Sequence, residues 1–414
     1  MEADEIIVLI PQYMERFKCV GNACEDTCCK FWRIDIDYDT YKKYTKISDP
    51  KLRYLVGEYV QKVKGESNKN RYANFKLKED GYCAFLDEDG LCMFQKKCGE
   101  AYLSSVCLTY PRRQVRINDT MECSGAVSCH EVARLMLFDE RPMEFDELII
   151  KSGEKTFYES ILVTTDEECD KKPILRWLWP LRNISIDILQ NRMLSFRERL
   201  ILLGLFTDKL EEYRDEGNLH MLEQHISKYK RIINSGDLKS LLVDIPSDGY
   251  LQFKMIMEML IYRLRFTAIS PSFANILEEF KLGIGYKEGI TTEQLFTSYN
   301  KIKSDLLIMF DEQFPQVFEN YFVNYAFSTV FPMCPSDNLM GNYIRLILNY
   351  AILKMFLVGV GACRKGYNKD SVQKVFSAVS ITVEHNPQYV DLMVDSVKNR
   401  PGGALAYTTV LIQD

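Results

Sequence analysis

The segment "CVGNACEDTCCK", residues 19–30, brings four thiols together: Cys19, Cys24, Cys28 and Cys29. Thiols at this density form disulfides, bind zinc or hold an iron–sulfur cluster. Adjacent Cys28 and Cys29 point their side chains in different directions. We therefore expect one of them to serve the site, while the other packs or serves a second site.

Three more cysteines follow at long spacing, as Cys83-x8-Cys92-x14-Cys107. A structural zinc site usually takes two short Cys-x2-Cys hooks, and the sequence contains none. A site gathered from distant loops favours a larger inorganic centre, in which each of four irons needs a thiolate. The Cys-x3-Cys-x2-Cys spacing of radical enzymes is also absent.

The cellular compartment bears on whether the cysteines form disulfides. The chain opens with "MEADEIIVLIP", which has early acidic residues and an apolar run cut short at Pro11, so it does not read as a secretory signal. We predict a cytoplasmic protein, whose thiols stay reduced. The odd total of 13 cysteines agrees with this, and disulfides are the least favoured interpretation.

Polar residues near two of the cysteines are candidates for contact with a cofactor. In "CLTYPRR", Tyr110 and Arg112 follow Cys107, and an arginine there could offset the charge of a four-thiolate cluster. The alternative is a solvated surface charge. Ser128 and Glu131 form a capping-box pattern that predicts a helix start at Cys129. The helix dipole would then lower the pKa of that thiol, unless the thiol only fills a gap.

The amino-acid composition argues against some classes of binding partner. With 52 basic and 58 acidic residues the net charge is −6, which gives no footprint for nucleic acid. The longest apolar stretch, 343–362, contains Arg345, Asn349 and Lys354, and we predict a buried helix instead of a membrane span.

The secondary structure that the sequence predicts differs between the cysteine-rich part of the chain and the rest. Ten cysteines precede residue 130, so we predict a loop-rich cysteine-cluster module over 1–140 and an α-helical domain over 141–414. The fold class is mainly α, an irregular helical bundle, because apolar residues after 170 recur at helical spacing. The first module should carry a short strand or hairpin, with Ile34 and Ile36 on one face of "FWRIDIDY". Helices are predicted over 48–65 and 99–110. Glycine-rich segments at 283–289 and 359–366 follow helices and are not nucleotide loops.

Four ordered blocks carry a family resemblance: "FKCVGNACEDTCCKFWRIDID", "CAFLDEDGLC", "GEAYLSSVCLTYPRR" and "SCHEVARLML". They resemble the signature blocks of flagellin lysine-N-methylases, most densely over residues 13–137. The resemblance implies a bacterial cytoplasmic methyltransferase that uses S-adenosylmethionine to methylate lysines of flagellin. It also implies a [4Fe–4S] cluster, and no nucleic-acid or membrane partner is expected.

The resemblance maps the family's thiols onto eight positions. These are Cys19, Cys24, Cys28, Cys29, Cys83, Cys92, Cys107 and Cys129. Cys98 and Cys123 fall outside the pattern, and His130 stands where the family has proline. The resemblance leaves open which thiols bind, where S-adenosylmethionine sits, which group accepts the lysine proton, and whether transfer is polar or radical. The alternative function is a non-catalytic binding or scaffold protein that zinc or a cluster stabilises.

Overall fold

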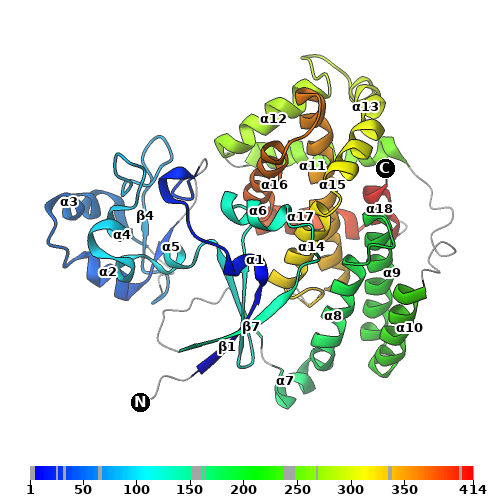
Figure 1. Cartoon of the computed structure of the whole chain (residues 1–414), viewed down its shortest axis with the longest axis horizontal. Coiled ribbons are helices and arrows are strands. Elements are labelled where there is room, and N and C mark those ends of the chain that lie inside the picture. Colours follow the sequence, from blue (N-terminus) through cyan, green and yellow to red (C-terminus); the bar gives the residue numbers. More distant parts are fainter. Residues whose placement is uncertain are drawn as a thin grey trace. The chain divides into compact units, whose positions relative to one another are not determined.

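The computed structural model describes residues 5–24, 27–30, 34–63, 68–151, 160–162, 164–235, 248–266, 269–333, 338–400 and 403–413. Most of these residues lie in helices, and the strands are short (Figure 1). The predicted mainly helical class is therefore confirmed. Cys334 lies outside the described residues.

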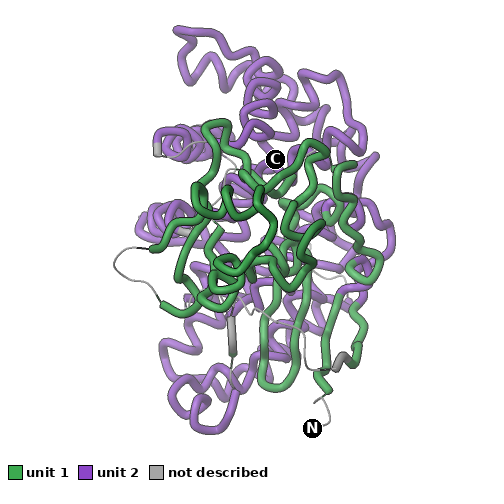
Figure 2. The backbone as a smooth tube through the Cα atoms, turned by 90° about the vertical axis from the view of Figure 1, so that its left-hand side faces the viewer, with its two compact units in different colours: residues 1–10, 14–132, 145–162 green, residues 11–13, 133–144, 163–414 purple. Residues whose placement is uncertain are grey.

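The chain forms two compact units (Figure 2). The first, here called the thiol unit, comprises Met1–Ile10, Met14–Val132 and Phe145–Leu162. The second, the helical unit, comprises Pro11–Tyr13, Ala133–Glu144 and Val163–Asp414. The division does not follow the sequence order, because two later strands return to a sheet of the thiol unit.

That sheet has five strands in the order β7-β1-β6-β5-β8. Their bounds are β1 Glu5–Pro11, β5 Arg112–Ile117, β6 Thr120–Gly125, β7 Phe145–Lys151 and β8 Ser160–Leu162. β5 and β6 form an antiparallel hairpin in which Ile117 pairs with Thr120, and Asn118 turns the chain with φ of 52°. β1 runs parallel to β6. This sheet is larger than the strand or hairpin that the sequence predicted.

A second, three-stranded sheet runs in the order β2-β4-β3, with β2 Asp35–Ile36, β3 Val60–Lys62 and β4 Ala73–Phe75. The predicted inward face is confirmed, because Ile34 and Ile36 are 1% and 0% exposed. Four short helices accompany this sheet: α2 Tyr38–Tyr44, α3 Pro50–Tyr59, α4 Met93–Cys98 and α5 Ser105–Thr109.

Two predicted helices of this region are shorter than expected. The helix expected over 48–65 ends at Tyr59, because the chain continues into β3, which pairs with β4. The helix expected over 99–110 is α5 alone. The Ser104 hydroxyl accepts a hydrogen bond from the Cys107 backbone N–H at 3.3 Å and so starts a new helix at Ser105. The predicted end at Tyr110 is confirmed.

The helical unit is built around α15, Leu339–Arg364, which packs against six other helices (Figure 1). The most apolar 18-residue window of this long helix is 89% buried, as the sequence predicted for 343–362. The packed partners are α9 Phe196–Asp215, α12 Pro271–Gly283, α13 Thr292–Gln313, α16 Lys369–Val383, α17 Pro387–Lys398 and α18 Ala404–Ile412.

The remaining helices complete this unit. They are α1 Gln12–Glu15, α6 His130–Leu137, α7 Asp166–Lys171, α8 Leu178–Leu189, α10 Leu222–Ser235, α11 Gly249–Phe266 and α14 Val317–Ser328. Helix α8 packs on α9, α10 and α14.

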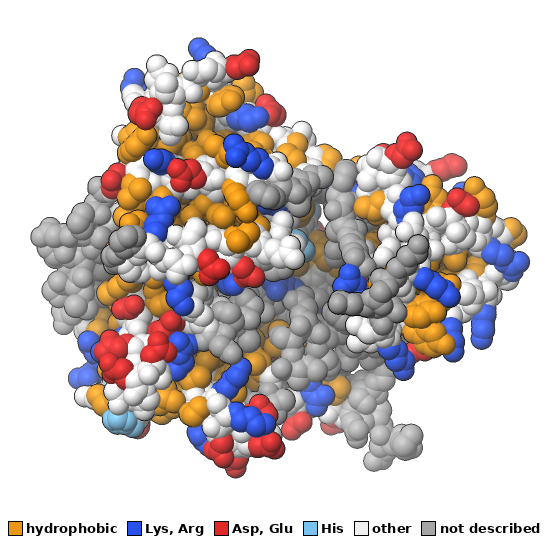
Figure 3. Space-filling view, turned by 180° about the vertical axis from the view of Figure 1, so that it is seen from behind, with side chains coloured by type: hydrophobic (Ala, Val, Ile, Leu, Met, Phe, Trp, Pro, Cys, Tyr) orange, Lys and Arg blue, Asp and Glu red, His pale blue; other side chains and the backbone are white. Residues whose placement is uncertain are grey.

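On the molecular face in Figure 3, the coloured Lys and Arg side chains are interspersed with Asp and Glu.

Candidate functional site: two groups of thiols and a polar pocket

The twelve cysteines in the described part of the chain are all free thiols. All eight cysteines of the family pattern belong to the thiol unit. Their surroundings separate them into two groups. We call Cys29, Cys83, Cys92 and Cys107 the core set, and Cys19, Cys24, Cys28 and Cys129 the outer set.

The core set lies on one apolar core beneath the three-stranded sheet. Cys83 is a buried member of that core, and Cys29, Cys92 and Cys107 pack against it. The Cys83 backbone N–H donates to the carbonyl oxygen of Cys29 at 2.8 Å, which joins two segments 54 positions apart in the chain. Burial raises the pKa of Cys83 to about 12, and the nearby Cys29 and Cys92 raise it further. The pKa of Cys107 is raised for the same reason, with contributions from Cys29, Cys83 and Cys92.

Tyr44 lies in the same core, with its ring stacked on Phe94 at 4.4 Å between centroids. Its hydroxyl is buried and has no hydrogen-bond partner among the residues that the structure describes. Burial raises the pKa of this phenol well above its ordinary value, and the neighbouring Cys107, Cys92 and Cys83 add to that rise. A protonated phenol beside three thiols is a hydrogen-bond donor without an acceptor, and such groups usually mark a missing partner.

Cys129, a member of the outer set, directly precedes α6. Burial raises the pKa of Cys129 to about 11, and Cys24 and Cys19 contribute to the rise. The backbone N–H groups of Glu131 and Val132 lower it, as a helix start should. The predicted net lowering of the Cys129 pKa is nevertheless wrong. The loss of hydration on burial raises this pKa by more than the N-terminus of the helix lowers it.

Tyr110, a predicted cofactor contact, lies with the outer set. Its hydroxyl is 3.2 Å from the Ser128 hydroxyl oxygen. Burial raises its pKa well above the ordinary value, with further contributions from Cys129, Cys28 and Cys24.

Arg112, the other predicted cofactor contact, has its guanidinium 5.4 Å from the ring centroid of Phe17. Its positive charge acts on Cys123, where it opposes the burial that raises the pKa of that thiol to about 11. Cys123 is not among the eight thiols of the family pattern.

Cys28 and Cys29 join the two sets. The Cys28 thiol donates a hydrogen bond to Cys29, which lowers the pKa of Cys29 to about 7. The pKa of Cys28 is raised, first by that hydrogen bond and then by burial, with smaller effects of Cys107 and Cys129. Cys28 does not pack on the apolar core that holds Cys29.

We tested whether the thiols suit a metal group. In the described residues, no three His, Cys, Asp or Glu side chains are arranged to hold a single metal ion. In number and chemistry the thiols do suit an iron–sulfur cluster, which takes four cysteine thiolates. The unpartnered Tyr44 hydroxyl also suits an anionic thiolate centre, because it can donate to sulfur.

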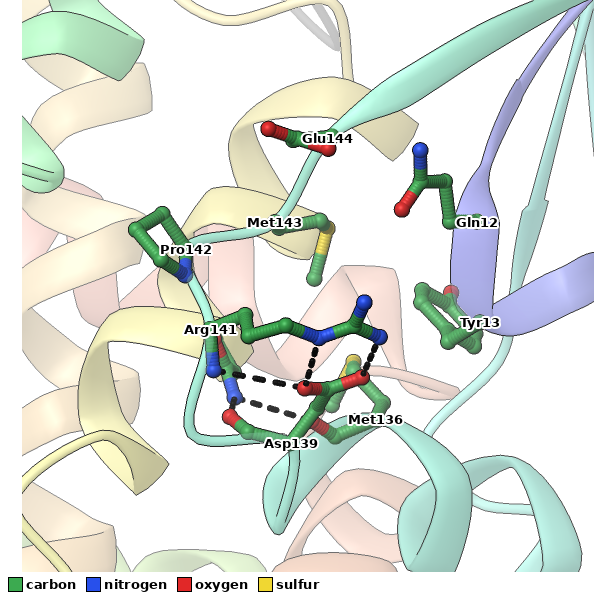
Figure 4. A pocket seen from close by; sticks show the side chains of 9 residues that line it. Gln12, Tyr13, Met136, Asp139, Arg141, Pro142, Met143 and Glu144 are labelled. Atoms are coloured by element: carbon green, nitrogen blue, oxygen red, sulfur yellow. Dashed lines mark hydrogen bonds and ion pairs between the residues drawn. The ribbon is translucent and has the colours of Figure 1, made fainter.

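A separate, small polar pocket lies within the helical unit (Figure 4). Arg141 reaches across it to Asp139, with Nη2 and Oδ2 3.0 Å apart, and Tyr13 and Gln12 line the opposite side (Figure 4). Asn320 donates through Nδ2 to the carbonyl oxygens of Met136 and Asp139 at 2.9 and 2.7 Å. Its Oδ1 is buried without a hydrogen-bond partner in the described structure.

Neighbouring helices hold the segment that carries this pocket. The Gln190 side chain donates to the Met143 carbonyl oxygen at 2.8 Å, and Arg192 donates to that of Glu140 at 3.0 Å. No local sequence pattern predicted the pocket, because its residues come from 12–13, 136–144 and 320.

The family model described as the FliB lysine N-methylase C-terminal domain matches residues 182–411. Lysine-N-methylases of Salmonella typhimurium (strain LT2) and Salmonella choleraesuis are each 25% identical over 395 residues, which cover 93% of both chains. The flagellar biosynthetic protein FliU of Salmonella muenchen is 35% identical over 144 residues, 34% of this chain and 84% of that protein. No solved structure matches.

The family model and the named relatives place the chain in the class of lysine methyltransferases. The chain belongs to the FliB lysine N-methylase family, which confirms the predicted resemblance.

Proposed function

We propose that the protein transfers a methyl group from S-adenosylmethionine to lysine side chains of flagellin, in the cytoplasm, and carries a [4Fe–4S] cluster in its thiol unit. The observation that carries the proposal is the shared length with the lysine-N-methylases, which match over 93% of both chains. The similarity to FliU, a flagellar biosynthetic protein, supports flagellin as the substrate.

The cluster would be held by thiolates of the core set, whose four thiols pack together with Cys98 on one apolar core. When bound, it would supply a cross-link between distant loops and a source of electrons. The residues themselves exclude water: Phe85 and Phe94 are 1% and 2% exposed, and the Tyr44 ring stacks on Phe94.

Methyl transfer to lysine requires a neutral amine, because only the free lone pair attacks a methyl sulfonium carbon. An ordinary lysine has a pKa of about 10.4, so roughly one in a few thousand is neutral at pH 7. The enzyme must therefore bind the side chain, orient its nitrogen and let the proton leave.

The pocket of the helical unit offers the groups for this task, and we assign the substrate lysine to it. Acceptors for an ammonium are the Asp139 carboxylate and the unpartnered Oδ1 of Asn320. Met136 and Met143 supply apolar contact for the four-carbon stem. The exposed Glu144 carboxylate lines the same pocket and can pass the proton to solvent.

The assay follows transfer of a labelled methyl group from S-adenosylmethionine to purified flagellin, with the full chain purified anaerobically. The wild-type protein should label flagellin, with a rate that rises with pH as more of the amine becomes neutral. Asp139→Asn should lower kcat/KM for flagellin at least about tenfold, since an amide orients an ammonium less well than a carboxylate.

Asp370→Asn is the matched control, because Asp370 is an exposed carboxylate of the same unit that pairs with Lys374. It should leave kcat/KM unchanged. An unaltered rate in Asp139→Asn would remove the pocket assignment alone. Failure of folded, cluster-containing wild-type protein to label flagellin would instead favour the binding or scaffold function.

A further inference from the structure

Helix α14 carries a carboxylate and two amides although it is buried along its whole length. All 12 residues of Val317–Ser328 are buried, and Glu319, Asn320 and Asn324 are 1%, 1% and 3% exposed. A buried charge or amide costs free energy unless it is fully paired, and a well-packed apolar residue often stabilises a core equally well. These three side chains therefore need a role other than stability.

We infer that Glu319 and Asn324 of α14, together with Arg192, are positioning residues of the polar pocket. The inference rests on the proposed assignment of the substrate lysine to this pocket. It adds the residues that keep the Asp139 carboxylate and the Tyr13 side chain in place, so that the lysine nitrogen is held in one orientation.

Glu319 is the centre of a buried ion network. Its carboxylate accepts hydrogen bonds from Arg192, through Nε at 3.0 Å and Nη2 at 2.8 Å, and from Nη1 of Arg199 at 2.7 Å. Arg199 also donates to the carbonyl oxygens of Leu194 and Leu189, at 3.0 and 2.9 Å. The pairing through two nitrogens fixes the Arg192 guanidinium, although the side chain of Arg192 is 42% exposed.

The remaining nitrogen of Arg192 reaches the segment that carries the pocket. Nη1 donates to the carbonyl oxygen of Glu140 at 3.0 Å, and Glu140 lies between the pocket residues Asp139 and Arg141. One guanidinium thus links the buried Glu319 carboxylate to the backbone beside Asp139. A lysine would lack the planar fork that pairs with a carboxylate through two nitrogens and keeps a third for a carbonyl oxygen.

The two asparagines of α14 hold other parts of the pocket. Asn320, which lines the pocket itself, donates to the carbonyl oxygens of Met136 and Asp139 at 2.9 and 2.7 Å. The Oδ1 of Asn324 accepts a hydrogen bond from the hydroxyl of Tyr13 at 2.5 Å, and Tyr13 also lines the pocket (Figure 4). One buried helix therefore supports the pocket at three places.

Hydrogen–deuterium exchange of the full chain tests the hold on the pocket segment without any activity measurement. Arg192→Ala should speed exchange of the backbone N–H groups in peptides that cover residues 138–144, because Glu140 loses its hydrogen bond to the guanidinium. The variant should still fold, since Arg199 continues to pair with the Glu319 carboxylate.

Arg176→Ala is the matched control. Arg176 has a similar exposure of 48% and lies in the same unit, where it donates to the Asp170 carboxylate at 2.7 Å and to the carbonyl oxygen of Cys169 at 3.4 Å. It does not line the pocket. This variant should leave both the exchange over residues 138–144 and the rate of methyl transfer unchanged.

The methyl-transfer assay then shows whether the hold serves the reaction. Arg192→Ala should lower kcat for flagellin about tenfold or more with little change in KM, because a displaced pocket misplaces the lysine nitrogen but leaves the rest of the flagellin contact intact. Arg192→Lys keeps a cation beside Glu319 and should recover part of kcat. Tyr13→Phe removes only the hydroxyl bonded to Asn324; it should also lower kcat, and it serves as the second variant if Arg192→Ala does not fold.

Unchanged exchange over residues 138–144 in folded Arg192→Ala would overturn the inference, whatever the rate. Faster exchange with an unaltered kcat would also overturn it, provided that Asp139→Asn lowers kcat/KM. Failure of the proposed lysine assignment gives a different result: Asp139→Asn keeps the full rate, while Arg192→Ala still speeds exchange and so confirms the support that α14 gives to this segment.

Discussion

Three aromatic rings surround the imidazole of His225 in the helical unit. The ring stacks on Phe206 with centroids 5.0 Å apart, and Tyr229 and Tyr213 contact it at 4.8 and 5.5 Å. Its Nε2 is 3.2 Å from the carbonyl oxygen of Phe206. Burial lowers the pKa of His225 below its ordinary value, because a charged imidazolium would lose its hydration here.

His225 should therefore make the stability of the protein depend on pH. Below a pH of about 6.5 the unfolded chain binds a proton on this imidazole more readily than the folded chain does. Above that pH, the neutral imidazole of His225 makes its full contribution to the free energy of unfolding. This contribution is lost as the pH falls toward the pKa of His225 in the folded protein, which is the lower of the two. Chemical unfolding between pH 5 and 7 should show a smaller loss in His225→Gln than in the wild type. Equal losses in both proteins would assign the pH dependence to other groups.

At the level of residues, the sequence predicted the thiols but not their partners. Cysteine is rare enough that its clustering marked the N-terminal part of the chain, and the family resemblance then selected eight of the ten cysteines there. Tyr44, Asp139 and Asn320 belong to common residue types, and only the folded chain shows that each is buried or lines a pocket. The pKa of Cys129 was predicted in the wrong direction, because burial of a thiol cannot be deduced from its position at a helix start.

At the level of elements, two glycines allow α12 and α15 to pack closely. A Cβ atom built on Gly283 would lie 1.8 Å from the carbonyl oxygen of Gly359, and one on Gly359 would lie 2.4 Å from the Phe280 side chain. The glycine-rich segments that follow predicted helices thus have a packing role here. This agrees with the prediction that they are not nucleotide loops.

Gly283→Ala should consequently destabilise the helical unit. The methyl group meets backbone, which cannot move aside as a flexible side chain can, so the expected loss is about 1–3 kcal/mol in the free energy of unfolding. Gly249→Ala, at the start of α11, is the matched control, because its Cβ would make only an ordinary contact at 3.7 Å. Denaturant unfolding compares the two variants, and equal stability in both would contradict the close packing.

Helices were more predictable than strands for a physical reason. The buried helix α15 can be predicted from local sequence, because its apolar residues form one long continuous segment. In the five-stranded sheet, β1 pairs with β6, which lies more than 100 positions later in the chain. Strand β5 pairs with β8, and helix α6 lies between these two strands in the sequence. Such pairing depends on contacts between distant residues, which no local pattern reveals.

At the level of the whole molecule, the two units rely on different sources of stability. The helical unit buries long apolar faces, with 22 buried residues on α15 alone. The thiol unit has twelve buried residues in its larger apolar core and three in a smaller one. Cores this small often need a metal or disulfides for support, and its described thiols are free.

Metal removal should therefore separate the units in calorimetry. The anaerobically purified protein should show the transition of the thiol unit at a higher temperature than protein stripped of iron and zinc by chelation. The transition of the helical unit should stay in place, because its core contains none of the eight thiols. Adding back iron and sulfide should restore the first transition. If both transitions fell together on stripping, the metal would be supporting the helical unit as well, and the assignment of its structural role to the thiol unit would be wrong.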